Sequence, residues 1–402
     1  MAEARVAPAA TAAGDRRLLF VLSGNMVLDA IEVSVVLVAL PSIAADLGLS
    51  VWAVQWLMTG FALGFAAVLL LGPRLTARWG LRRCYLAALL VFAAASVAGG
   101  VSDTLWLLIT ARVIKGGCAA LTAPAGLALI AATYPDGPAL RRAVSVYSLF
   151  GAAGFTLGLL LSGLLTPVSW HWTFLFPAPV ALALLAWGLR VVPRTGRREP
   201  PRLRPAVLRD AGLLRSTLGA ATLNGTYAAL LLLVTFHAAD RFGWRPWQLA
   251  LALLPACVPL AVSVPFAGRL TARFGTAGPI AAGAAAALAG HLLLLLRPEP
   301  ASYATGLLPT LLLVGLAFVL SFAALNLQAT RGLPAGARGA AVPVYQTGVQ
   351  VGGVVTLPLA AALLTHGSGH RPALLALVLV QAAGVAVSLT GLRGRTPKGA
   401  PS

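Results

Sequence analysis

The chain has 402 residues, of which 59% are hydrophobic and only 10% are charged, and its mean hydropathy is +0.87. A soluble domain carries about 25% charged residues, so this composition excludes a soluble protein and predicts an all-α membrane protein. The net charge of +19 suggests a nucleic-acid-binding protein at first sight, but the placement of the charges along the chain, described below, excludes that class.

The apolar segments fall into two groups of six, each segment near or above the ~20 residues that a spanning helix needs. An Ala-rich basic tail, 1–17, precedes an N-terminal six-helix bundle at 18–193, and a basic, Pro-rich linker at 194–215 leads to a C-terminal six-helix bundle at 216–392 and a tail at 393–402. The first apolar run is too long and too charged for a cleavable signal. The expected spans are 18–40, 52–72, 84–102, 105–134, 143–166, 173–193, 216–238, 247–267, 277–296, 304–329, 341–365 and 371–392.

The positive charges lie mainly on one side of this predicted topology. With the N-terminus inside, most of the 30 lysines and arginines fall in the tails, the linker and the inner loops, whereas the outer side holds only Arg241, Arg245, Arg297 and Arg371. This is the positive-inside distribution of a plasma-membrane protein with both termini in the cytoplasm. It explains the basic composition without a nucleic acid.

The two halves share a repeated motif. Arg74–Gly80 reads RLTARWG and Arg269–Gly275 reads RLTARFG, and each follows the second span of its half. Parallel repeats of six helices, related by an axis along the membrane normal, are a transporter architecture. We therefore expect two pseudo-symmetric bundles with these motifs in equivalent cytoplasmic loops.

Four charged residues lie well inside the predicted spans rather than at their ends. The first span holds Asp29 and Glu32, and the fourth holds Arg112 and Lys115, each pair three residues apart on one helix face. Each charge costs about 2.5–3.5 kcal/mol at bilayer depth, so pairing is expected. Counting 1.5 Å per residue places Glu32 level with Arg112, and Asp29 level with Lys115. Either carboxylate can be a titrating group or one half of a static ion pair.

The second half offers only neutral polar groups as candidates for a substrate cavity, which favours an apolar or mildly polar substrate. These candidates are Asn224, Tyr227, Asn326, Gln328, Tyr345, Gln346 and Gln350. Glycines also share one helix face, at Gly151, Gly154 and Gly158 and again at Gly348 and Gly352. Such faces indicate close helix packing, or alternatively a sliding seam between the halves.

Several stretches of the first half resemble the major facilitator superfamily, most closely its drug:proton antiporters. Ile31–Pro41 resembles the first-helix motif LDxTVVNVALP, with Glu32 at the Asp position. Gln55–Gly64 is similar to the second helix. The other matching stretches are Pro73–Arg83, similar to the loop motif GRLADRxGRRR; Ala111–Gly117, similar to RxxQG; Gly158–Gly163, in place of GPxxGG; and Ser169–Phe174, similar to SWRWxF.

The resemblance implies a twelve-helix secondary transporter that exports a small amphipathic compound by alternating access in exchange for protons. It assigns proton coupling to Glu32, with Asp29, Arg112 and Lys115 around it. It also makes the basic loop a gate, formed by Arg74, Arg78, Gly80, Arg82 and Arg83. The chain departs from the motifs at Pro73, Ala77, Lys115, Leu159 and Ser162. A carrier with another coupling, or with none, is therefore the main alternative.

Other classes have weaker support in the sequence. No Walker A motif is present, which argues against an ATP-driven pump. His366 and His370 lack further ligands for a metal site, and Cys84, Cys118 and Cys257 form no CxxC pair. An enzyme or sensor should show a cluster of catalytic residues or a soluble domain. We expect no enzyme activity, cofactor, metal or nucleic acid, and a monomer whose partners are its substrate, protons and the lipid bilayer.

Overall fold

The computed structural model describes residues 12–135, 137–194, 205–263, 266–297, 302–366 and 369–393. Residues 1–11 of the predicted N-terminal tail, 195–204 of the predicted linker and 394–402 of the predicted C-terminal tail lie outside these ranges. Twelve helical segments of the described chain are long and apolar enough to cross a membrane. They coincide with the twelve predicted spans, so the predicted all-α membrane fold is confirmed.

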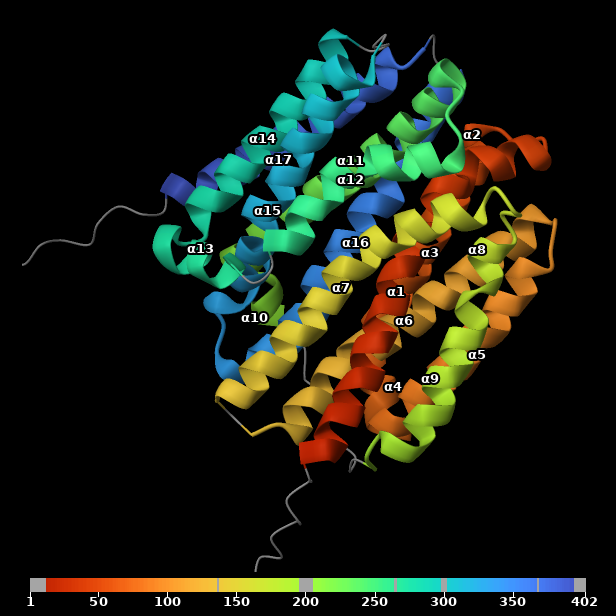
Figure 1. Cartoon of the computed structure of the whole chain (residues 1–402). Coiled ribbons are helices and arrows are strands. Elements are labelled where there is room, and N and C mark those ends of the chain that lie inside the picture. The colour runs from red at the N-terminus through yellow and green to blue at the C-terminus, as the bar shows by residue number, and fades with distance from the viewer. Residues whose placement is uncertain are drawn as a thin grey trace, which may run out of the picture.

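The first half contains six spans and three short helices. Its elements are α1 (Ala12–Asp46), α2 (Val51–Val54), α3 (Trp56–Leu69), α4 (Gly72–Trp79), α5 (Leu81–Gly100), α6 (Leu105–Thr133), α7 (Pro138–Leu165), α8 (Trp172–Leu175) and α9 (Pro177–Val191). Short helices α2 and α8 each continue into the following helix to complete a span. Because the chain reverses at every connection, α4 lies at one end of the bundle, and α2 and α8 lie at the other (Figure 1).

The second half repeats this plan. Its elements are α10 (Pro205–Leu208), α11 (Ala211–Phe242), α12 (Pro246–Ser263), α13 (Ala267–Phe274), α14 (Ala277–Leu296), η2 (Tyr303–Leu307), α15 (Leu308–Arg331), α16 (Ala335–His366) and α17 (Arg371–Arg393). Asp210 caps the start of α11 by accepting the Leu213 amide at 2.8 Å. Gly243 ends that helix in the left-handed conformation, with φ of 60°.

Glycines let the equivalent first and fifth spans of each half pack with their backbones close together. On α7, Gly151, Gly154 and Gly158 lie against α1, and a carbon added at Gly154 would be 2.8 Å from the Val27 carbonyl oxygen. On α16, Gly348 and Gly352 lie in the same way against α11. Both faces join helices of one bundle. The packing interpretation is therefore correct, and the alternative of a seam between the halves is wrong for these glycines.

The repeated motif forms a short helix in each half rather than an open loop. α4 and α13 each end at a glycine with positive φ, 87° at Gly80 and 70° at Gly275. In both helices the threonine of RLTAR donates its hydroxyl to the carbonyl three residues before it: Thr76 to Pro73, and Thr271 to Gly268, both at 3.1 Å. The two motifs occupy equivalent positions at the same end of the molecule, as the internal repeat predicts.

The two bundles meet along α7 and α12 and along α3 and α16. Near the α2/α8 end the approach is close: a carbon added at Gly163 of α7 would be 2.7 Å from the Ala250 side chain of α12. Short helix α2 also packs against α16 there. At the other end, α4 packs against α3 and α5, and α13 packs against α14 and α15.

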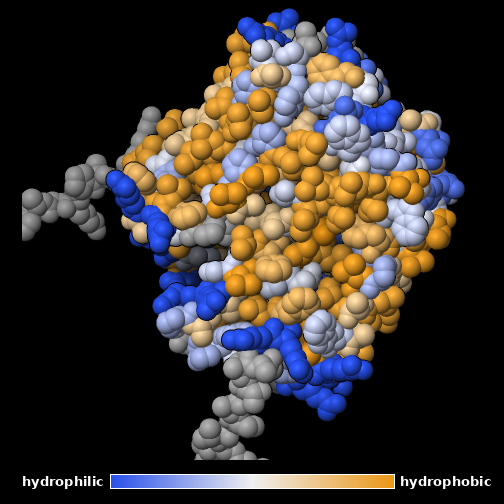
Figure 2. All heavy atoms as spheres, viewed as in Figure 1, coloured by the Kyte–Doolittle hydropathy of each residue, from blue (hydrophilic) through white to orange (hydrophobic). Residues whose placement is uncertain are grey.

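Apolar side chains cover the surface of the spans. Trp106, Leu164 and Leu379 are each more than 60% exposed, which would be unfavourable in water and is expected in lipid. Figure 2 shows hydrophobic residues over most of the visible face and hydrophilic residues gathered towards its ends. The protein therefore presents a lipid-facing surface along the lengths of its helices.

Candidate functional site

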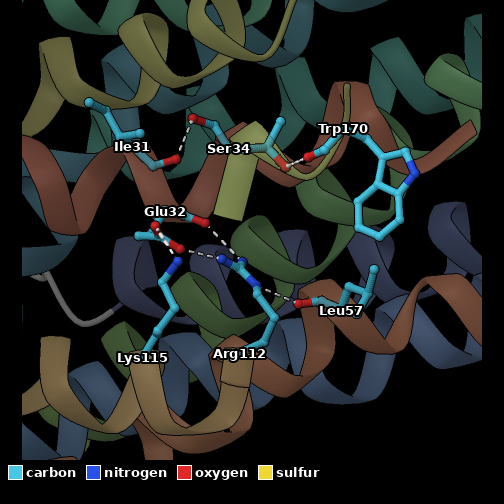
Figure 3. Close-up of polar contacts among 8 residues, drawn as sticks. Ile31, Glu32, Ser34, Leu57, Arg112, Lys115 and Trp170 are labelled. Carbon is cyan, nitrogen blue, oxygen red and sulfur yellow. Dashed lines mark hydrogen bonds and ion pairs between the residues drawn. The ribbon is translucent and has the colours of Figure 1, made fainter. Parts of the chain in front are cut away.

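The centre of the first bundle holds one carboxylate between two cations. Oε2 of Glu32, on α1, lies 2.6 Å from Nη1 of Arg112, and Oε1 lies 2.6 Å from Nζ of Lys115, both on α6 (Figure 3). The Arg112 contact is a well-aligned hydrogen bond. The Lys115 contact is an ion pair whose geometry does not meet hydrogen-bond criteria. Glu32 thus neutralises only one of the two positive charges.

The guanidinium of Arg112 is held by the backbone as well. Nη2 donates to the carbonyl oxygen of Glu32 at 2.8 Å, and Nε donates to the carbonyl oxygen of Leu57 on α3 at 2.8 Å. The ring of Phe61 lies beneath it, 4.7 Å from Cζ. A guanidinium offers a fixed fork of donors, and three acceptors from two helices fix its orientation here. Arg112 therefore ties α1, α3 and α6 together.

Lys115 occupies an aromatic enclosure. Its Nζ lies 5.1 Å from the centre of the Phe92 ring, on α5, and 5.7 Å from that of Phe174, on α8. The side chains of Glu32, Arg112 and Lys115 are at most 1% exposed. Removing one partner from a buried charge pair costs about 3–5 kcal/mol, because the remaining charge stays buried. This three-residue cluster is thus a closed structural unit in the conformation seen.

Asp29 has no cation partner among the described residues. Its Oδ2 accepts hydrogen bonds from Nδ2 of Asn25 at 2.9 Å and from Oγ1 of Thr122, on α6, at 2.8 Å. The side chain is buried, with 6% of the residue exposed. Both donors are neutral. The predicted contact between Asp29 and a cation is therefore absent here, and the expected pairing of Asp29 with Lys115 is wrong.

The direction of the side chains explains this correction. Cα–Cβ bonds in a helix tilt towards its N-terminus, and α1 and α6 run in opposite directions. Glu32 therefore leans towards the α4/α13 end, and Lys115 leans towards the α2/α8 end, so that the two meet. Asp29 leans in the same direction as Glu32 and meets Thr122, which lies two turns beyond Lys115. Counting depth along the backbone alone could not reveal this shift.

The neutral candidates of the second half do not form one cluster. Asn224 joins α11 to α16 by donating to the Val349 carbonyl oxygen at 3.0 Å, and Asn326 donates to the Phe322 carbonyl oxygen of its own helix at 2.8 Å. Gln328 lies in a small crevice beside α11, α14 and α17. Tyr345 is buried, and Gln346 and Gln350 are half-buried on α16.

An aromatic cluster connects the two bundles, and only Tyr227 among its members was predicted from the sequence. Tyr227 of α11 lies 4.4 Å from Phe318 of α15 and 6.1 Å from Phe155 of α7, measured between ring centroids. Phe322 stacks on Phe318 one turn further along α15, at 6.4 Å, and is 44% exposed. Asn326 follows one turn later. The remaining aromatics carry no sequence signal that distinguishes them from lipid-facing residues.

His291 was also not among the residues predicted from the sequence. It lies in α14 and is fully buried, and Nδ1 is 2.6 Å from the Ala287 carbonyl oxygen. A carbonyl only accepts, so Nδ1 carries the proton. Nearby, Thr226 donates to Gln381, which donates to the Ala284 carbonyl oxygen on α14. The only indication of this buried polar group in the sequence is a single histidine within an Ala- and Leu-rich span.

The residues of the predicted gate lie at the α4/α13 end. Arg74 and Arg78 are exposed on α4, and Gly80 joins α4 to α5. Arg82 donates to the Leu189 carbonyl oxygen of α9 at 2.6 Å, and Arg83 is exposed. In the described part of the chain, no group of three or more metal-ligating side chains occurs.

Comparisons with known proteins agree with the resemblance inferred from the motifs. A model of the Major Facilitator Superfamily matches residues 22–357. The puromycin resistance protein pur8 of Streptomyces alboniger is 31% identical, over 89% of this chain and 83% of that protein. The tetracenomycin C resistance and export protein of Streptomyces glaucescens is 27% identical, over 84% and 73%. Alignments to some longer relatives cover less than half of those proteins.

A solved structure shares the fold. It is a bacterial homologue of the human lysosomal transporter Spinster, with a TM-score of 0.71 and 17% identity, and the match covers 97% of this chain and 100% of that structure.

Proposed function

We propose that this chain, which belongs to the Major Facilitator Superfamily, exports a small amphipathic natural product in exchange for protons, with Asp29 as the carboxylate that takes up and releases the proton. The family establishes a membrane transporter of the twelve-helix type. The observation that carries the coupling proposal is the unequal environment of Glu32 and Asp29, which lie one turn apart on α1.

Glu32 is poorly suited to exchanging a proton in the conformation seen. Both of its oxygens face cations, and its neutralisation would leave Arg112 and Lys115 buried without a counter-charge. Asp29 differs because its partners, Asn25 and Thr122, are neutral. With all four groups ionised the bundle centre is neutral, so a proton on Asp29 changes its net charge by one. Such a change supplies the differential free energy that alternating access requires.

This assignment reverses the roles expected from the sequence motif, in which Glu32 occupies the acidic position. We infer that Glu32 organises the bundle by binding both cations, and that Asp29 carries the exchanged proton. The positions of the four charges are the same in either assignment. The two assignments make opposite predictions for the neutral variants Asp29→Asn and Glu32→Gln.

The substrate class follows from the relatives and from the aromatic cluster. Relatives are named for resistance to puromycin and for export of tetracenomycin C, which supports export of an antibiotic-like compound. Phe155, Tyr227, Phe318 and Phe322 provide ring faces where the two bundles meet. Binding sites for such ligands are mostly apolar with a few polar groups, and Asn224 and Asn326 are suitably placed polar groups.

The orientation in the membrane follows from charge. The basic helices α4 and α13 lie at one end, and we propose that this end faces the cytoplasm of the cell that carries the protein in its plasma membrane. The start of α1 and the end of α17 both lie on that side (Figure 1). The close approach of α7 and α12 near α2 and α8 then closes the outer side. We propose that one chain forms the complete transport unit.

Inverted membrane vesicles test the function and the proton assignment together. Labelled puromycin and tetracenomycin C are offered to vesicles with and without an imposed proton gradient. In Asp29→Asn the amide oxygen can still accept the hydrogen bonds from Asn25 and Thr122, but the side chain can no longer take up a proton. We therefore expect normal exchange of internal for external substrate but loss of gradient-driven accumulation. If Asp29→Asn accumulates substrate normally, and Glu32→Gln folds and exchanges substrate normally but does not accumulate it, the proton belongs to Glu32. Accumulation that is insensitive to a proton ionophore would overturn proton coupling.

A further inference from the structure

A basic hollow opens at the α4/α13 end of the second bundle, away from the charged cluster and the aromatic cluster. It has a volume of about 600 Å³ and lies between α13 and the end of α15. Its main side chains are Thr271, Arg273 and Phe274 of α13, and Leu327 and Arg331 of α15. Binding pockets for small ligands have volumes of about 300–1,000 Å³, so the hollow is large enough for a phosphate-bearing headgroup.

The two arginines of the hollow have no ion-pair partner among the residues that the structure describes. Neither Arg273 nor Arg331 makes a hydrogen bond or an ion pair with another residue of the described chain, and no carboxylate lines the hollow. Arg273 lies over the ring of Phe274, with Cζ 5.3 Å from the ring centroid. That contact holds the guanidinium without using its donors. Two guanidinium groups are therefore available to an anion, and guanidinium groups in general can bind phosphate oxygens in a bidentate manner.

The rim of the hollow is apolar, which favours a lipid over a soluble anion. Phe274 is 55% exposed and Leu327 is 42% exposed, and both lie beside the arginines. Phe266, immediately before α13, is also 55% exposed and lies 5.9 Å from Cζ of Arg269. Exposed aromatic and aliphatic groups next to cations, at the end of spanning helices, match the boundary between headgroups and acyl chains.

The internal repeat provides a natural comparison. Arg78 and Trp79 of α4 correspond to Arg273 and Phe274 of α13. The first half has no counterpart of Arg331, because α6 ends in Ala131, Ala132 and Thr133. Arg78 is thus an exposed arginine in an equivalent short helix that lacks the second arginine. It serves as a matched control for general attraction between a basic surface and an anionic membrane.

We propose that this hollow binds the phosphate headgroup of an anionic phospholipid, with Arg273 and Arg331 on the phosphate and the acyl chains against Phe274 and Leu327. Each basic group near an anionic membrane surface contributes about 1 kcal/mol. This corresponds to roughly five-fold in affinity per arginine, and to roughly thirty-fold for both. The site is independent of the transport cycle proposed above.

Native mass spectrometry of the full-length protein in detergent tests the site by titration with phosphatidylglycerol. We expect Arg273→Ala/Arg331→Ala to bind the first lipid roughly thirty-fold more weakly, and Arg78→Ala to bind like wild type. Ala272→Asp places a carboxylate in the hollow and should weaken binding, whereas Ala77→Asp, its counterpart in α4, should not. Of the five substituted positions, four are exposed and Ala77 is half-buried on a short helix, so we expect the variants to fold.

Four results would overturn the proposal. Equal weakening by Arg78→Ala would show that binding depends only on general basic charge. Undiminished binding by the double variant would place the lipid elsewhere. Displacement of the lipid by millimolar inorganic phosphate or glycerol phosphate, or equal binding of phosphatidylcholine, would show that the hollow does not select an anionic lipid.

Discussion

Nζ of Lys115 lies 2.6 Å from Oε1 of Glu32, so a single carboxylate on α1 holds both cations of α6. The second carboxylate of α1, Asp29, is bound by neutral donors instead. The two carboxylates and two cations balance in number, but both cations contact Glu32 and neither contacts Asp29. This asymmetry is the basis of our proposal that Glu32 has a structural role and that Asp29 couples transport to protons.

Glu32→Gln should destabilise the protein strongly. The substitution preserves the shape of the side chain but leaves Arg112 and Lys115 buried without their counter-charge, at a cost of about 3–5 kcal/mol. Lys115→Met should cost less, because Glu32 keeps its contact with Arg112. Thermal unfolding of the purified variants in detergent measures both effects.

The double variant Glu32→Gln/Lys115→Met is the control for this prediction. Removing Lys115 relieves one of the two unpaired charges that Glu32→Gln creates, so the double variant should be less destabilised than the sum of the two single variants. Additive effects would mean that Glu32 and Lys115 do not interact in the folded protein.

The sequence predicts the number, placement and repeat symmetry of the helices because these depend on local properties. Apolar runs of about 20 residues, charge asymmetry and the RLTAR repeat are each contained in a short stretch. The involvement of Glu32 and Arg112 was also predictable, because a buried charge needs a partner. The confirmed parts of the fold and the main ion pair follow from composition and spacing alone.

The exact partners were not predictable from spacing. Whether Lys115 reaches Glu32 or Asp29 depends on opposite side-chain tilts of about one helical turn on antiparallel helices. The aromatic cluster depends on contacts between α7, α11 and α15, which are far apart in the sequence. His291 escaped notice because a single histidine in an apolar span has no pattern.

Gly64→Ala should destabilise the packing of α3 on α6. An added carbon would overlap the carbonyl of Val113, and a backbone atom cannot move aside as a flexible side chain can. Overpacking of this kind costs about 1–3 kcal/mol. Gly278→Ala in α14 is the matched control, since an added carbon there meets nothing within 4 Å, and alanine favours a helix by about 0.5–1 kcal/mol. The midpoint temperature of thermal unfolding should fall in Gly64→Ala and not in Gly278→Ala. Equal midpoint temperatures for the two variants would contradict the close approach of α3 and α6.

Ala77→Asp should restore the acidic residue of the gate motif. Ala77 is half-buried on α4, between the exposed Arg74 and Arg78. We expect a carboxylate there to hold the α4/α13 end closed and to shift the protein towards its outward-open state, whereas the uncharged variant Ala77→Asn should not. The measurement is labelling of the variant Phe322→Cys from each side of the membrane with an impermeant maleimide. The native cysteines Cys84, Cys118 and Cys257 are buried, so we expect little background labelling. An unchanged ratio of labelling in Ala77→Asp would show that the motif does not act as a gate here.

Phe322→Ala should weaken the binding of substrates that contain aromatic rings. Phe322 is the most exposed member of the aromatic cluster, and its ring stacks on Phe318. An aromatic contact contributes about 0.5–1.5 kcal/mol beyond its buried area, which corresponds to a roughly 2- to 12-fold rise in the KM of puromycin exchange. Leu316→Ala removes a side chain of equal exposure, 44%, from another face of α15 and should leave the KM unchanged.

Tyr227→Phe completes this comparison. It keeps the ring beside Phe318 and removes only the hydroxyl, which donates to the Ala256 carbonyl oxygen at 3.4 Å. If ring faces bind the substrate, this variant should retain the wild-type KM, and Phe322→Ala should not. If Tyr227→Phe raises the KM and Phe322→Ala does not, the tyrosine hydroxyl is the contact and the substrate lies deeper between α11 and α12. Equal rises for Phe322→Ala and Leu316→Ala would remove the aromatic cluster from the substrate path.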